Sequence, residues 1–261
     1  MSETVVLPTS ITDALACGEL LHGVWKTLYS VWEMHQTSGV SDAVPCASSN
    51  AAKAFDMILL VSGATTYSRS PNVGHLIVPR QWNKPESLSL TPGQWAMDNG
   101  AFSGFDPGAF VRMLEAYHGR AGCLFVTAPD VVGDAAATFA LWPFWSRLIR
   151  GLGYIPAWVA QDGMRPELTP NSRAIFVGGS TAFKESEEVR SLCLYAKSRQ
   201  IWVHWGRVNG KRRYELALKA GVDSIDGSGF SRFPNTNIPK VVEWESEIAA
   251  QPELLDLGDG R

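Results

Sequence analysis

The chain has 261 residues, of which 45% are hydrophobic and 19% charged, with 24 glycines and 15 prolines. This composition is ordinary for a globular protein and excludes a collagen-like, coiled-coil or wholly disordered chain. The net charge of −3 hides a basic region (147–240), which has 15 Lys and Arg against 8 Asp and Glu and is flanked by acidic regions. A basic face on a weakly acidic protein can bind a polyanion locally.

The apolar runs and the cysteines limit where the protein is expected to work. The longest apolar runs, such as 57–61 and 155–160, fall far short of the roughly 20 residues that a membrane helix needs. The N-terminus lacks the basic start and the apolar run of a signal peptide. The four cysteines form no Cys-x-x-Cys pair, so reduced thiols are expected instead of a zinc site or a disulfide framework. We therefore expect a cytoplasmic protein without membrane contact, metal or cofactor.

The predicted elements begin with a helix over residues 10–36, where leucines and valines recur near helical spacing, followed by a loop over 37–50. From residue 57 onward, short apolar segments typical of buried strands alternate with helical segments. The expected strands are 57–63, 74–79 (or an edge hairpin), 94–100, 123–130, 155–163, 174–180, 201–206 and 222–229. The expected helices are 107–118, 134–150 despite Pro143, 184–199 and 211–220.

This alternation of strands and helices is typical of right-handed βαβ units and a parallel sheet. About seven such strands within about 175 residues suit a (β/α)8 barrel of the TIM type better than a doubly wound sheet. No Gly-rich dinucleotide or phosphate-loop motif follows a strand. The sequence therefore predicts a single α/β domain over 1–261, with an N-terminal helical extension (1–50), a barrel core (57–232), and a C-terminal helix and acidic tail (233–261).

Polar residues and glycines recur at the predicted carboxyl ends of the strands, the edge where barrel enzymes carry their chemistry. Each motif also has a structural explanation, because Asp-Asn-Gly and Asp-Gly form turns, a Gly pair can end a strand, and a histidine can be a core residue. Turns alone explain poorly why almost every strand end carries one. The motifs are Asp98-Asn99-Gly100-Ala101-Phe102, Asp130, Gln161-Asp162-Gly163, Gly178-Gly179-Ser180, His204-Trp205-Gly206 and Asp223-Ser224-Ile225-Asp226-Gly227.

These residue types suit chemistry at a glycosidic carbon. One carboxylate can attack the anomeric carbon while a second handles the proton of the leaving or entering group. An Asp together with a Gln can read the hydrogen-bonding edge of a heterocyclic base. A Gly-Gly pair lets the backbone approach a planar ligand closely.

The order of these motifs resembles the tRNA-guanine transglycosylase superfamily, whose (β/α)8 barrel exchanges guanine for a 7-deazaguanine in nucleic acid. The family's Asp-Ser-Gly-Gly-Phe-Gln motif corresponds to 98–103 here, its Gly-hydrophobic-Asp-x-Phe-Asp motif to 221–226, and the resemblance covers about 57–232. No cysteine follows Cys193, so the family's zinc subdomain is missing, and the chain is shorter than a typical tRNA enzyme. In both respects it is similar to the compact phage-type branch that inserts 7-deazaguanines into DNA.

The resemblance implies a role for each candidate residue. Asp226 would be the nucleophile on C1′, and Asp98 the general acid/base of the base exchange. Nucleic acid, DNA in preference to tRNA, would be the partner, and its target base would leave the stack to be attacked. The substrate-binding residues would be Asp130 and Gln161 on the incoming 7-deazaguanine, with Gly178, Gly179, Phe102 and His204 around it. The phosphate contacts would come from Arg207, Lys211, Arg212, Arg213 and Arg232.

Three alternatives stay open at this point. The substrate can be tRNA instead of DNA. A non-catalytic partner subunit of the same fold would lack one of the two key carboxylates, whereas Asp98 and Asp226 are both present. An unrelated metal-dependent hydrolase would need clustered His and carboxylate ligands, yet only His204 of the five histidines falls at a predicted strand end.

Overall fold

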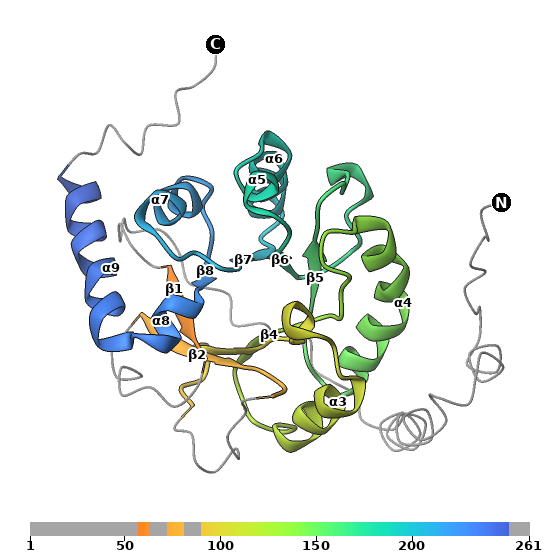
Figure 1. Cartoon of the computed structure of the whole chain (residues 1–261). Helices are drawn as coiled ribbons and strands as arrows, with labels where there is room; N and C mark the ends of the chain where they lie inside the picture. Colours follow the sequence, from red (N-terminus) through yellow and green to blue (C-terminus); the bar gives the residue numbers. More distant parts are fainter. Residues whose placement is uncertain (1–56, 63–71, 81–89, 251–261) are drawn as a thin grey trace, which may run out of the picture.

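The computed structural model describes residues 57–62, 72–80 and 90–250, and the predicted N-terminal extension (1–50) and the end of the acidic tail lie outside these ranges. Eight parallel strands pair in chain order and close into a barrel, because β8 pairs with β1 (Figure 1). The predicted eight-stranded barrel of the TIM type is therefore confirmed. The strands are β1 (Ile58–Val61), β2 (Val73–Ile77), β3 (Trp95–Met97), β4 (Cys123–Thr127), β5 (Pro156–Ala160), β6 (Ala174–Val177), β7 (Trp202–Trp205) and β8 (Ser224–Asp226).

Helices surround the barrel on its outside (Figure 1). None of the described helices is long and apolar enough to cross a membrane. The α-helices are α3 (Pro107–Ala116), α4 (Ala135–Gly151), α5 (Thr181–Lys184), α6 (Glu187–Ser198), α7 (Lys211–Lys219), α8 (Ser228–Arg232) and α9 (Pro234–Ala249). Two single-turn 3-10 helices, η3 (Ala101–Ser103) and η4 (Pro166–Leu168), follow β3 and β5.

One open alternative is decided by the structure, and two elements differ from the sequence-based expectation. The segment near 74–79 is a strand and not an edge hairpin, since β2 pairs in parallel with both β1 and β3. The single helix expected over 184–199 is divided into α5 and α6, because the Ser186 side chain accepts the N–H of Val189 and starts a new helix. The short helix α8, directly after β8, was not predicted at all.

Helix starts follow the capping residues that the sequence contains. Asp106 and Asp134 accept the backbone N–H three residues ahead, and Pro107 occupies the first position of α3. Asp134 is therefore a helix cap, as its position in the sequence suggests. These caps place α3 and α4 directly after the strand ends that carry Asp98 and Asp130.

Successive side chains of each strand point alternately into the barrel and outward to the helices, so they form two apolar layers. One set points into the barrel and fills its centre with a mixture of large and small side chains, namely Leu60, Leu76, Ala96, Phe125, Ala157 and Ala174. The other set, including Trp95, Met97 and Ile175, packs outward against the helices in the larger core. This filled interior closes the barrel below the carboxyl ends of the strands.

Gly74 lies where the backbones of β2 and β3 approach each other closely. A methyl group at this position would lie 2.0 Å from the backbone oxygen of Gln94, the atom that accepts the N–H of His75. We expect Gly74→Ala to lower the free energy of unfolding by about 3 kcal/mol or more, since backbone cannot yield as a flexible side chain can. Urea unfolding followed by circular dichroism measures this.

Gly151→Ala is the matched control for this substitution. Gly151 ends α4 with no atom within 4 Å of the added methyl group, so alanine there should leave stability unchanged or raise it. Equal unfolding midpoints for the two variants and the parent would contradict the close pairing of β2 with β3.

Candidate functional site

A pocket of about 500 Å³ opens at the carboxyl ends of the strands. Of the predicted site residues, His204 lies buried beneath it, and the cluster Lys211, Arg212 and Arg213 does not line it. The predicted residues that do line the pocket are Asp98, Phe102, Asp130, Gln161, Gly178, Gly179, Arg207, Asp226 and Arg232.

The two-residue period of β-strands explains why side chains from different strands converge there. Ala96 faces the barrel interior, so Asp98, two residues further on, faces the pocket above it. On β8 the buried Ser224 is followed in the same way by Asp226. Closure of the barrel then places β3 and β8 around one mouth.

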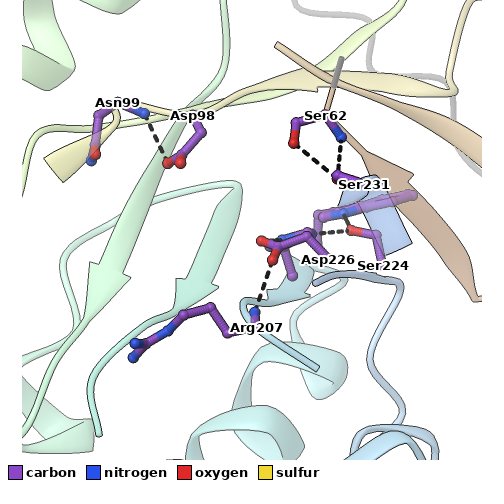
Figure 2. Close-up of polar contacts among 9 residues, drawn as sticks. Ser62, Asp98, Asn99, Arg207, Ser224, Asp226 and Ser231 are labelled. Carbon is purple, nitrogen blue, oxygen red and sulfur yellow. Dashed lines mark hydrogen bonds and ion pairs between the residues drawn. The ribbon is translucent and has the colours of Figure 1, made fainter. Parts of the chain in front are cut away.

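Asp98 is a half-buried carboxyl group at the end of β3 (Figure 2). Its Oδ1 accepts the backbone N–H of Asn99 at 2.8 Å. Loss of water around the group, together with the negative charges of Asp226 and Asp130, raises the pKa of Asp98 to about 7. At neutral pH this carboxyl group therefore exists in both protonation states, as a group that gives and takes a proton must.

Asp226 is held by two donors at the end of β8. Its Oδ1 accepts the backbone N–H of Arg207 at 2.9 Å (Figure 2), and its Oδ2 lies 3.1 Å from Nε2 of His204. The two contacts hold both carboxylate oxygens in a defined orientation.

His204 forms the inner part of this arrangement. It is fully buried between the rings of Phe125 and Phe176, and its Nδ1 lies 2.9 Å from Oγ of Ser224. Ser224 Oγ also accepts the indole N–H of Trp202. Because a carboxylate oxygen accepts hydrogen bonds, Nε2 of His204 is the donor in the contact with Asp226. The histidine is thus a core residue that also orients a site carboxylate.

Asp130 is the centre of an amide network from three strand ends. Its two oxygens accept the side-chain N–H groups of Asn99 at 2.7 Å and of Gln161 at 2.6 Å. Gln161 Oε1 in turn accepts the N–H of Gly133. Burial raises the pKa of Asp130, and the two amide donors partly offset this effect. The network orients the Asp130 carboxylate and one free N–H of Gln161 toward the pocket that both residues line.

Gly178 and Gly179 are glycines for steric reasons. A methyl group on Gly178 would lie 2.8 Å from Nε2 of Gln161 and displace the amide that holds Asp130. Gly179 has φ of +72°, and a methyl group there would lie 2.6 Å from Oδ2 of Asp162. The Gly pair therefore lets the loop after β6 lie directly against the end of β5.

Arg207 and Arg232 are the predicted phosphate ligands that line the pocket. Arg207 adopts a positive φ of 61°, its Nη2 donates to the Gly179 carbonyl at 2.5 Å, and its guanidinium group lies 4.3 Å from the centre of the Phe102 ring. Phe102 itself is 67% exposed, which makes its other face available to a planar ligand. Arg232 is exposed at the end of α8, near the mouth.

The remaining predicted phosphate ligands lie on α7 and have intramolecular partners. Lys211 pairs with Glu247 of α9 and with Glu215, and Arg212 pairs with Glu185 at 2.8 Å. Arg213 donates to the backbone carbonyl of Arg207 at 3.0 Å, so it supports the Arg207 loop and does not itself face the pocket.

Sequence analysis missed several residues of this site. Lys184 gave no signal because it reads as part of an amphipathic helix, yet it lines the pocket with 2% of its surface exposed. Thr127 lies on the pocket wall, and its buried hydroxyl oxygen has no hydrogen-bond partner in the described part of the chain. Ser231 of α8 accepts both the N–H and the hydroxyl of Ser62 at 2.9 Å and fastens α8 over the end of β1 (Figure 2).

The described residues contain no group of three or more His, Cys, Asp or Glu side chains placed to hold a metal ion. Cys123 and Cys193 are free thiols. Burial raises the pKa of the Cys193 thiol to about 12, so it is protonated at neutral pH.

No protein-family model matches the chain, and no curated protein matches it. Among solved structures, one described as "Native KDPGal structure" is similar with 14% identity and a TM-score of 0.45, covering 80% of this chain and all of that one. The Bacillus subtilis YkuI protein, with an EAL domain and in complex with c-di-GMP and calcium, is similar with 11% identity and a TM-score of 0.31. That match covers 61% of this chain and 46% of the other. At these scores the function must be argued from the pocket itself.

The raised pKa of Asp98 can be measured directly. We expect its carboxyl carbon to titrate with a pKa near 7 by NMR, and to titrate lower in Asp226→Asn, where one of the repelling charges is removed. Since the unfolded chain releases this proton at lower pH than the folded one, the Asp98 contribution to stability falls as pH rises from about 4 to about 7. Asp98→Asn should remove that part of the pH dependence.

Asp134→Asn is the control, because Asp134 caps α4 away from the pocket and Asn caps a helix as well as Asp does. This variant should leave the titration of Asp98 unchanged. A pKa of Asp98 in the ordinary range of an exposed aspartate would contradict its burial beside Asp226 and Asp130.

Proposed function

We propose that the protein is a transglycosylase that exchanges guanine in nucleic acid, DNA in preference to tRNA, for a 7-deazaguanine. The observation that carries this proposal is the contrast between two carboxyl groups in one pocket. The two oxygens of Asp226 are oriented by the Arg207 N–H and by His204, whereas the half-buried Asp98 has its pKa raised to about 7. Such a contrast divides the roles of nucleophile and acid/base between two residues of the same type.

In the first step, an oxygen of the Asp226 carboxylate attacks C1′ of the target nucleotide. The bond between C1′ and N9 breaks, its electron pair goes to guanine, and the protonated Asp98 supplies the proton that guanine takes up. The sugar is then held as an ester on Asp226. His204 and the Arg207 N–H keep the attacking carboxylate oriented. They hydrogen-bond to the carboxylate again when the ester bond breaks.

In the second step, a 7-deazaguanine replaces guanine and Asp98 accepts its N9 proton. N9 attacks C1′, the ester bond breaks, and Asp226 leaves as a carboxylate, so the sugar keeps its configuration after two displacements. Asp130 has lone pairs for the N1–H and amino group of a guanine-type base, and the free N–H of Gln161 can donate to its carbonyl. The exposed face of Phe102 offers a stacking surface for the ring.

The nucleic acid enters this proposal through the arginines at the pocket mouth. Arg207 and Arg232 lie beside the exit of β7 and β8, where the backbone of a flipped nucleotide would pass. The preference for DNA rests on the resemblance to the compact branch of the tRNA-guanine transglycosylase superfamily. Both carboxylates line the pocket, which argues against a non-catalytic partner subunit.

Exchange of radiolabelled guanine into DNA and into tRNA tests the proposed function. We expect label in DNA with the parent protein, none with Asp226→Asn, and a rate lower by about 10²–10⁴-fold with Asp98→Asn, as for a lost general acid/base. The parent should also give a protein–DNA adduct that survives denaturation, and Asp226→Asn should not.

Asp134→Asn serves again as the control and should exchange guanine at the parental rate. If tRNA alone is labelled, the substrate is tRNA and not DNA. If neither polymer is labelled by the folded parent protein, the transglycosylase proposal is wrong, and normal exchange by Asp226→Asn would refute the nucleophile assignment.

The salt dependence of DNA binding tests which arginines contact phosphates. Arg232→Ala should lower the slope of log affinity against log salt by about 0.7–0.9, the value for one phosphate contact. Arg212→Ala should leave the slope unchanged, because Arg212 is paired with Glu185 outside the pocket. If both variants bind like the parent, the polymer follows another path across the surface.

A further inference from the structure

Lys184 is a buried cation of the pocket wall that the proposed exchange does not use. It is the last residue of α5, just after the loop that carries Gly178 and Gly179. Only 2% of its surface is exposed, although its side chain lines the pocket. Lysine is rarely buried to this extent unless it is paired. The position therefore requires an explanation from its partners.

The partners found in the described part of the chain do not neutralise it. The ammonium group has three N–H donors, and its hydrogen-bond acceptor is the Gly179 carbonyl at a long 3.4 Å. No carboxylate of the described residues forms an ion pair with Lys184. An ammonium group that is buried without a counter-ion destabilises the fold.

A second cationic side chain lines the pocket beside Lys184. Arg207 donates from Nη2 to the same Gly179 carbonyl and packs on the Phe102 ring, and it too forms no ion pair within the described ranges. One carbonyl oxygen thus serves both a lysine and an arginine. Several of their N–H groups remain available for an acceptor that comes from outside the chain.

The charges around Lys184 also leave its ammonium group without full compensation. Burial, together with repulsion by Arg207 and Arg213, lowers the pKa of Lys184 to about 8, while Asp226 and Asp162 act in the opposite direction. Neither carboxylate is free to move to the lysine. Asp226 is held by the Arg207 N–H and His204, and Asp162 accepts both the N–H and the hydroxyl of Ser180.

We propose that Lys184 and Arg207 form a subsite for a phosphate group beside Asp226. An oxyanion there accepts the remaining N–H groups of both side chains and neutralises the two neighbouring charges. The phosphate comes either from the target nucleotide of a polymer or from a free phosphorylated compound. The subsite itself does not depend on the proposed base exchange, because it requires only that the pocket binds this anion.

Thermal unfolding with inorganic phosphate tests the subsite, with chloride at equal ionic strength as the reference. Phosphate should raise the Tm of the parent and of Lys184→Arg, which keeps the charge, and should not raise that of Lys184→Met. Lys240→Met is the matched control, because Lys240 is an exposed lysine of α9 outside the pocket, and this variant should respond like the parent.

The unfolding temperature without phosphate separates this role from a structural one. Lys184→Met removes a buried charge that lacks a counter-ion, so its Tm in chloride should equal or exceed that of the parent. A lysine that the fold needs would give a lower Tm. Absence of a phosphate effect on the parent, or an equal effect on Lys184→Met, would overturn the subsite.

Calorimetric titration with deoxyguanosine and with its 5′-monophosphate distinguishes the two sources. The parent should bind the monophosphate more tightly by about tenfold or more, as for a hydrogen bond to a charged group, and Lys184→Met should lose this preference. If inorganic phosphate stabilises the parent but the monophosphate binds no better than the nucleoside, the subsite is supported for a free phosphorylated compound. The nucleotide-based function proposed above would then be contradicted.

Discussion

The pairing of β8 with β1 is the contact on which the site depends. It aligns Leu60 with Asp226 and Ile58 with Ser224, and it turns eight consecutive strands into a closed ring. Only in a closed ring do the ends of β3 and β8, more than 120 residues apart in the chain, border one pocket. A shift of one residue in this pairing would turn Asp226 away from the pocket, because side chains alternate along a strand.

The filled interior of the barrel gives the two carboxyl groups different chemistry. Apolar side chains below the mouth withdraw Asp98 from water and raise its pKa, whereas Asp226 receives donors from the backbone after β7 and from His204 within it. His204 can play this part because its ring is held by Ser224 on one side and by the rings of Phe125 and Phe176. Core packing and the orientation of the Asp226 carboxylate therefore depend on each other.

The cations of the basic region differ in how they are paired. Lys211 and Arg212 of α7 form ion pairs with Glu247 and Glu185. Lys184 and Arg207, which line the pocket, share one carbonyl oxygen instead. Neither of these two forms an ion pair among the described residues, and both lie on the wall of the pocket that Asp226 also lines.

The sequence by itself determined the barrel, most of its elements and nine of the residues that line the pocket. Strand periodicity, caps such as Asp106 and Asp134, and polar residues at strand ends are local signals that need no knowledge of distant contacts. Only the tertiary structure decided that His204 bonds Asp226, that Arg212 pairs with Glu185, and that Lys184 is buried at the pocket. These facts join residues about 20 or more positions apart or on different elements, so they depend on strand register and helix packing, which a local pattern does not contain.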